Sequence, residues 1–157
     1  MVFAIVLYTY DLCLIKLPGQ FDRENNFYFI LNQKLRERCP RFLQAAHGYL
    51  FYLMTGLSRL PPASGVVVRG IDSEKAPAAR SKFAIGMIFH FSGFSSTAPN
   101  WWVAKGFAEG GGVILRIKLL DKNSNSRDIQ EISAFGSSEA EVILLPNFRV
   151  VVTGIAV

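Results

Sequence analysis

The residues of this chain that best combine reactive type with an informative spacing are Glu139 and Glu141. In an extended strand alternate side chains point to the same face, so the two carboxylates would lie about 6–7 Å apart on one side of the chain. Two like charges in this arrangement repel each other, which is unfavourable unless a cation binds or forms beside them. A Glu-x-Glu sequence also occurs at solvated sheet edges, where it discourages pairing between sheets. Both interpretations, a cationic site and a charged edge, stand until the rest of the chain is considered.

The elements around the acidic pair predict a polar turn followed by a buried strand. Gly136, Ser137 and Ser138 are residue types that favour turns. The run from Val142 to Leu145 is continuously apolar, which is typical of a strand that is buried on both faces. We therefore expect the acidic pair at the mouth of a buried strand.

The composition predicts a single domain, residues 1–157, and narrows the class of partner. Half of the 157 residues are hydrophobic, which indicates a globular chain with a sizeable core. The formal net charge of +5 fits a phosphate-bearing ligand, an acidic partner or nucleic acid. The chain has no block of consecutive Lys or Arg, which argues against nucleic acid.

The few cysteines and histidines predict no metal site. Cys13, Cys39, His47 and His90 are the whole set, and they do not form a cluster with metal-ligand spacing. The sequence leaves open whether the two cysteines pair, and it does not indicate a compartment.

The order of the predicted elements is helices first and short strands afterwards, which indicates an α+β fold. The apolar segment 2–7 is interpreted as a first strand or a buried segment, because it lacks the basic leader and the cleavage site of a signal peptide. No apolar run is long enough to span a bilayer. Helical spacing of apolar residues extends over 27–38 and 42–60. Short, mostly antiparallel strands are expected at 66–68, 84–91, 113–119, between 129 and 132, at 142–145 and at 148–157.

Three segments, taken in order, resemble the Arg–Ser–Glu signature of arginine-specific mono-ADP-ribosyltransferases. This class carries a Glu-x-Glu motif and includes ecto-enzymes, rotifer-type members and clostridial and cholera-like toxins. The segments are Val66-Val67-Val68-Arg69-Gly70, Gly93-Phe94-Ser95-Ser96-Thr97 and Phe135-Gly136-Ser137-Ser138-Glu139-Ala140-Glu141-Val142. Residues 7–10 and 27–36 are similar to the helical lead-in of the eukaryotic and rotifer-type members. The resemblance covers nearly the whole chain and implies N-terminal helices followed by a mostly antiparallel, split β-sheet core around an NAD cleft.

The resemblance also implies which residues bind NAD⁺. Arg69 would hold the phosphates or the adenosine ribose, because its planar fork suits bidentate contacts. Gly70 would let its backbone approach the nicotinamide amide. Ser96 would orient Glu141 through a hydrogen bond, and Thr97 would lie beside it in the same site. The family pattern Ser-Thr-Ser reads Ser96-Thr97-Ala98 here, so the first hydroxyl is kept and the third is missing.

Aromatic residues are expected near the nicotinamide and near the acceptor. Phe107 stands where the family often has an aromatic residue, and Trp101 and Trp102 compete with it for this role. Phe135 and the Gly-Ser-Ser after it match the loop that recognises the protein substrate in the family. Each motif alone is also compatible with a surface Arg, a turn Gly, a turn hydroxyl or a core Phe.

The carboxylates then acquire distinct expected roles. Cleavage of the nicotinamide–ribose bond passes through an oxocarbenium-like state, as in glycoside cleavage. Glu141 would stabilise this developing cation and accept a hydrogen bond from the ribose 2′-hydroxyl. Glu139 would bind an incoming arginine guanidinium and help to remove its proton. The mutual repulsion of the two groups should raise one of their pKa values.

Three functions remain possible at this point. The first is transfer of ADP-ribose from NAD⁺ to an arginine-bearing protein, and the second is hydrolysis of NAD⁺ on the same fold. The third is a non-catalytic basic domain that binds an acidic protein or nucleic acid, to which the neighbouring Trp101 and Trp102 would contribute.

Overall fold

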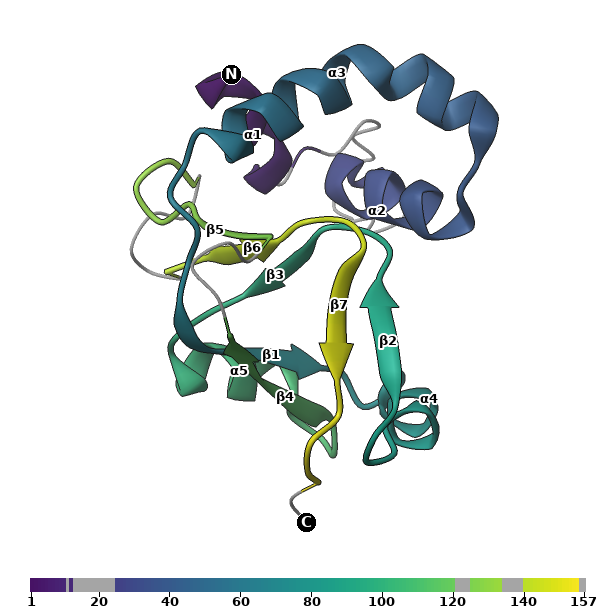
Figure 1. Cartoon of the computed structure of the whole chain (residues 1–157). Helices are drawn as coiled ribbons and strands as arrows, with labels where there is room; N and C mark the ends of the chain where they lie inside the picture. The colour runs from purple at the N-terminus through teal and green to yellow at the C-terminus, as the bar shows by residue number, and fades with distance from the viewer. Residues whose placement is uncertain (11, 13–24, 121–124, 134–139, 156–157) are drawn as a thin grey trace, which may run out of the picture.

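The computed structural model describes residues 1–10, 12, 25–120, 125–133 and 140–155, and its helices and strands separate along the chain (Figure 1). The elements are α1 (Val2–Thr9), α2 (Phe27–Glu37), α3 (Pro40–Ser58), β1 (Gly65–Ile71), α4 (Ala76–Lys82), β2 (Ile88–Phe91), β3 (Ser95–Thr97), α5 (Trp101–Phe107), β4 (Val113–Leu119), β5 (Ser126–Asp128), β6 (Val142–Leu144) and β7 (Phe148–Val151). The first three helices gather at one end of the molecule, while α4 and α5 lie with β1 and β4 toward the other (Figure 1).

The strands form three small antiparallel sheets. These are β1–β4, β2–β7 and the three-stranded order β3–β6–β5. A bridge between Val68 and Ala98 connects the first sheet to the third. The two residues exchange both backbone hydrogen bonds, with N···O distances of 2.7 and 2.9 Å. The expected α+β class with a split, mostly antiparallel sheet core agrees with this arrangement.

Strand β6 joins the two hydrophobic cores, because both of its faces are buried. Ile143 packs with residues of α1, α2 and α3 in one core. Val142 and Leu144 pack with Val67, on β1, in the other. This is the two-sided burial that the apolar run predicts.

Local sequence signals explain where the helices begin and end. The Asn26 side chain caps α2 by accepting a hydrogen bond from the Phe29 amide at 3.3 Å. Helix α2 ends at Arg38, which adopts a left-handed conformation with φ of 51°. Pro40 occupies the first turn of α3, where its missing N–H costs nothing.

Several predicted elements differ from the observed ones. The segment 2–7 is part of a helix, α1, so the strand interpretation is wrong. The buried-segment interpretation holds only in part, because Ala4 and Ile5 are buried whereas Val2 and Phe3 are exposed. Periodicity alone does not separate a strand from a helix in so short an apolar run. The strand expected over 84–91 begins only at Ile88, because Gly86 makes a turn with φ of +86°. Around residues 129–132 the chain turns, and the strand β5 lies just before it.

The short helices α4 and α5 do not follow from hydrophobic spacing. Each has seven residues and begins after a turn, so neither presents two full turns of apolar periodicity. Helix α5 is nevertheless capped, because the Asn100 side chain accepts a hydrogen bond from the Trp102 amide at 2.9 Å.

Candidate active site

Arg69 and Ser96 are brought together by the bridge between the sheets. Val68 and Ala98 are hydrogen-bonded to each other, which places the next residue of β1 beside β3. The Arg69 guanidinium donates from Nη1 to the Ser96 carbonyl oxygen at 2.6 Å. Among the described residues Arg69 has no carboxylate partner, so its charge and remaining N–H groups are available to an anion.

Glu141 enters the site at the start of β6. Its side chain is 6% exposed, and Oε2 accepts a hydrogen bond from the Ser133 hydroxyl at 3.4 Å. Its carbonyl oxygen accepts from the Ile129 amide at 3.0 Å, which holds the backbone in place. The contacts of the described residues include no bond from the Ser96 hydroxyl to Glu141, so the orienting role of Ser96 stays a prediction.

Thr97 ties β3 to the strand that follows Glu141. Its hydroxyl is buried and donates to the Val142 carbonyl oxygen at 2.6 Å. Thr97 also lies opposite Val142 in the register of the two strands. This contact is across the sheet, so Thr97 fixes the spacing between the element that carries Ser96 and the element that carries Glu141.

The extended Glu-x-Glu geometry that the sequence predicts is not what the chain adopts. Ala140 has a φ of +43°, so the backbone between the two glutamates turns out of the strand conformation. Strand β6 starts at Val142, and Glu139 lies outside the described residues, as does the segment 134–138 with Phe135. The prediction that the two carboxylates point the same way assumed an extended strand from Glu139 to Glu141, and this assumption does not hold.

A single cavity of about 1200 Å³ contains all the predicted site residues that the structure describes. Its lining includes Arg69, Gly70, Ser96, Thr97, Phe107 and Glu141. The volume exceeds the range of about 300–1,000 Å³ that is usual for small-molecule sites, and is therefore adequate for an elongated dinucleotide.

Gly70 and Phe107 meet at the contact between β1 and α5. A Cβ on Gly70 would overlap the Ala104 carbonyl oxygen and lie 2.7 Å from the Phe107 Cβ. Glycine at this position thus allows α5 to lie directly on β1, a structural reason that is independent of any ligand. Of the three aromatic candidates, Phe107 is in the cavity lining, whereas Trp101 and Trp102 are not.

The helices supply a part of the cavity that sequence reasoning missed. Tyr8, on α1, is fully buried, and its hydroxyl oxygen accepts a hydrogen bond from Asn32 Nδ2 at 3.0 Å. Burial raises the pKa of Tyr8 well above its usual value; the charges of Tyr28 and Glu141 act in the same direction, and Arg69 acts against it. Tyr8 therefore lies within the electrostatic reach of both Arg69 and Glu141.

Asn32 is a second missed residue, because the helical pattern assigns it to a polar face. It is only 2% exposed, and its Nδ2 also donates to the Tyr28 carbonyl oxygen at 3.1 Å. The signal that could have found it is its spacing of four residues from Tyr28, on the face that α2 turns inward.

The cavity carries an excess of positive charge. Its cationic lining residues are Arg36, Arg69, Lys75 and Lys82, against the two carboxylates Asp72 and Glu141. Lys75 is paired with Asp72. Within the described residues no group of three or more His, Cys, Asp or Glu is placed to hold a metal ion, and no described helix is long and apolar enough to cross a membrane. The lining as a whole suits a ligand with anionic groups.

The fold has counterparts among solved structures. Superposition on the ADP-ribosyltransferase Vis from Vibrio splendidus gives a TM-score of 0.62 with 23% identity, over 81% of this chain and 60% of that chain. Superposition on the ADP-ribosyltransferase domain of Salmonella SpvB gives a TM-score of 0.64 with 22% identity, over 99% of this chain and 80% of that chain. Superposition on the C3 exoenzyme of Clostridium limosum gives a TM-score of 0.63 with 17% identity, over 99% of this chain and 77% of that chain.

The chain has the ADP-ribosyltransferase fold. The predicted fold class is thereby confirmed. The chain spans about 60% of the length of Vis. No protein-family model and no curated protein sequence matches it. At these identities the likeness concerns the ADP-ribosyltransferase fold alone.

Proposed function

We propose that this protein transfers ADP-ribose from NAD⁺ to the guanidinium of an arginine side chain on an acceptor protein. The observation that carries the proposal is that Arg69, Ser96 and Glu141, from three separate segments, line one basic cavity of dinucleotide size. The ADP-ribosyltransferase fold of the chain supports NAD⁺ as the substrate.

The proposed reaction breaks the bond between ribose C1′ and the nicotinamide nitrogen. The electron pair leaves with nicotinamide, whose ring becomes neutral, and positive charge develops on the ribose. Glu141 would stabilise that charge, which exists mainly in the transition state. Arg69 would hold the phosphates, so that the reacting carbon is kept beside Glu141.

The acceptor nitrogen then forms the new bond to C1′ and loses one proton. Glu139 would bind the guanidinium and take this proton. Vis has been crystallised in complex with agmatine, which carries a guanidinium group, and this supports an arginine-type acceptor for the same fold. Specificity for arginine rests here on Glu139.

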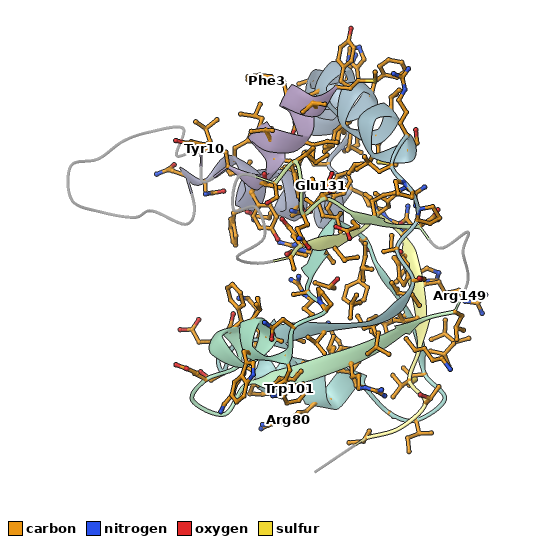
Figure 2. All side chains as sticks on the ribbon, turned by 90° about the vertical axis from the view of Figure 1, so that its left-hand side faces the viewer. Phe3, Tyr10, Arg80, Trp101, Glu131 and Arg149 are labelled. Atoms are coloured by element: carbon orange, nitrogen blue, oxygen red, sulfur yellow. The ribbon has the colours of Figure 1, made fainter. Side chains whose placement is uncertain are left out.

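The test is release of nicotinamide from labelled NAD⁺ together with labelling of an acceptor, either agmatine or a peptide that contains arginine. Glu141→Gln should lower both at least about a hundredfold, because it removes the charge that opposes the developing cation. Glu131→Gln is the matched control, since Glu131 is an exposed carboxylate outside the cavity lining (Figure 2). Full turnover of NAD⁺ by the Glu141→Gln variant would overturn the assignment.

A second candidate is hydrolysis of NAD⁺, because it needs Arg69 and Glu141 but no guanidinium site. Glu139→Gln separates the two activities: transfer to agmatine should be lost while nicotinamide release with water as acceptor persists. If wild-type protein consumes no NAD⁺ and instead binds oligonucleotides in a salt-sensitive manner, the non-catalytic binding function would replace both.

A further inference from the structure

A second hollow adjoins the cavity at the corner where α2 is followed by α3. It has a volume of about 610 Å³ and is lined by Leu35, Arg38, Leu43, His90, Ser92, Pro146 and Asn147. His90 and Ser92 also line the large cavity, so the two spaces are neighbours around these residues. A molecule lying in the hollow would therefore be next to the proposed NAD⁺ site.

Two cationic or titratable side chains line this hollow and two more lie on α2 and β7, and we call these four, Arg36, Arg38, His90 and Arg149, the basic corner. Arg38 and His90 line the hollow, and Arg36 lines the cavity beside His90. Arg149 stands directly opposite His90 in the β2–β7 register, and its side chain lies on the outside of the molecule (Figure 2). All four are exposed, and none of them has an ion pair among the described residues.

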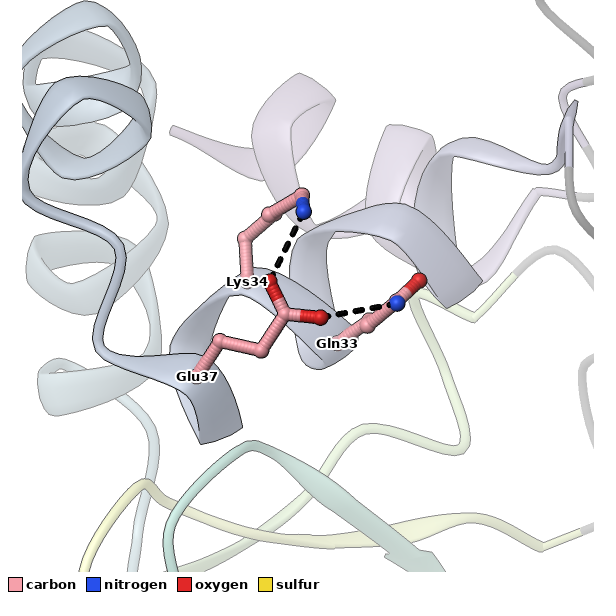
Figure 3. Close-up of polar contacts among 3 residues, drawn as sticks. All are labelled: Gln33, Lys34 and Glu37. Atoms are coloured by element: carbon pink, nitrogen blue, oxygen red, sulfur yellow. Dashed lines mark hydrogen bonds and ion pairs between the residues drawn. The ribbon is translucent and has the colours of Figure 1, made fainter.

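The carboxylate nearest in sequence to this corner is already engaged. Glu37 accepts hydrogen bonds from Lys34 at 2.7 Å and from Gln33 at 2.8 Å (Figure 3). The Lys34 contact lowers the pKa of Glu37, and the same contact raises the pKa of Lys34. Glu37 thus makes its ion pair with Lys34, and neither Arg36 nor Arg38 forms an ion pair with it.

We propose that the basic corner binds an acidic segment of the acceptor protein and so selects arginines that have acidic neighbours. The inference rests on the proposed function. An acceptor arginine is itself a cation, so an isolated arginine or an arginine-rich peptide is repelled by the cationic side chains of the basic corner. Asp or Glu residues near the acceptor arginine turn the repulsion into attraction. At physiological ionic strength the screening length is about 8 Å, so only residues close to that arginine take part.

The lining of the hollow favours a protein segment over nucleic acid. Leu35, Leu43 and Pro146 give it aliphatic walls, and the described residues of its lining include no Phe, Tyr or Trp on which a base could stack. The exposed Trp101 and Trp102 are on α5 and line neither space. Aliphatic walls with a charged rim are compatible with side chains of an extended acidic peptide.

The experiment compares acceptor peptides that contain one arginine flanked by Glu, by Gln or by Lys, with agmatine as an acceptor that has no flanks. Wild-type protein should modify the Glu-flanked peptide with a kcat/KM about tenfold above that of the Gln-flanked peptide, from several exposed charge pairs acting together. The Lys-flanked peptide should be the poorest acceptor. The preference should fade as salt is raised.

Charge reversal at the corner tests the residues themselves. Arg38→Glu with Arg149→Glu should abolish or invert the flank preference. The kcat at saturating agmatine should be unchanged, because neither residue lines the cavity and repulsion of the agmatine cation acts on its KM. The control reverses Arg59 and Lys118 to Glu, two exposed residues outside both linings, and it changes the net charge equally. The control should keep the wild-type preference.

The outcomes separate this inference from the proposed function. Modification of agmatine and of all three peptides with equal kcat/KM would overturn the inference and leave the transferase intact. Failure to consume NAD⁺ with every acceptor would overturn the proposed function. Binding of the acidic peptide to the basic corner would still be measurable in that case, because the fluorescence anisotropy of a labelled peptide needs no turnover. A single-stranded oligonucleotide that displaces the acidic peptide at lower concentration than unlabelled peptide would identify the corner as a nucleic-acid site instead.

Discussion

Two tyrosine hydroxyls are placed in the interior of the helical end of the molecule. Tyr8 is fully buried beside the cavity. Tyr49, on α3, donates to the Ala4 carbonyl oxygen at 3.0 Å and so connects α3 to α1. Burial raises the pKa of both residues above their usual value. Both hydroxyls therefore keep their protons in the folded state at a pH where the unfolded chain loses them.

This difference makes stability depend on alkaline pH. Because the folded pKa values are raised, the free energy of unfolding is at its full value below about pH 10 and falls as the pH rises above it. Tyr49→Phe should cost about 1 kcal/mol at neutral pH, from the lost hydrogen bond, and should make the alkaline fall shallower. Urea denaturation at pH 8 and at about pH 11 measures both effects. The control is Tyr52→Phe: Tyr52 is 57% exposed, so its replacement should change the free energy of unfolding at neutral pH little. If the free energy of unfolding fell equally steeply with alkaline pH in wild type and in Tyr49→Phe, the explanation would be contradicted.

Residues on the strands of the site were predictable from sequence, whereas those on the helices were not. Arg69 and Ser96 lie within strands and Glu141 directly precedes one, in motifs with a recognisable order, and the three line one cavity. Tyr8 and Asn32 lie in the segments that resemble the helical lead-in, but nothing in those segments assigns them a place in the site. Their place comes from a contact between two residues that are 24 positions apart in sequence. A long-range contact of this kind is not encoded in local spacing.

At the scale of elements, β1 and α5 pack directly against each other at Gly70. Gly70→Ala should force α5 away from β1, with a cost of about 1–3 kcal/mol and loss of NAD⁺ turnover, because the new methyl group meets the Ala104 carbonyl. Gly48→Ala is the matched control on α3, since a Cβ there meets nothing within 4 Å. That control should stabilise the protein by up to about 1 kcal/mol through helix propensity. Thermal unfolding of the two variants should shift in opposite directions, and an unchanged Gly70→Ala protein would refute the packing argument.

A helix or strand could be predicted where its own residues show a clear hydrophobic pattern. Helices α2 and α3 are long and periodic, and β6 is a continuous apolar run, so their existence follows from the residues. Helix α1 is apolar on its exposed face as well as on its buried face, since Val2 and Phe3 are 60% and 76% exposed, and this hides its period. The turn at Ala140 has no Gly or Asn to signal its positive φ, so the sequence pointed to an extended strand there.

At the scale of the molecule, β6 is shared by two cores that would otherwise be separate. We expect them to unfold together, because exposing β6 removes packing from both. Trp101 and Trp102 are the two tryptophans of the chain, and they report on α5, whereas helical circular dichroism is dominated by α1–α3 at the end of the molecule that carries Phe3 (Figure 2). The two signals should give coincident denaturation curves. Two transitions at different urea concentrations would mean that the cores, and with them the predicted single domain, are independent units.

The double hydrogen bond between Val68 and Ala98 has a kinetic consequence. Both hydrogen bonds are made by main-chain atoms, so β1, which carries Arg69, and β3, which carries Ser96, already lie at a fixed separation before an anion binds. Capture of the pyrophosphate would then be a one-step encounter whose rate follows diffusion and charge, and slow rearrangements would be confined to the acceptor side of the cavity.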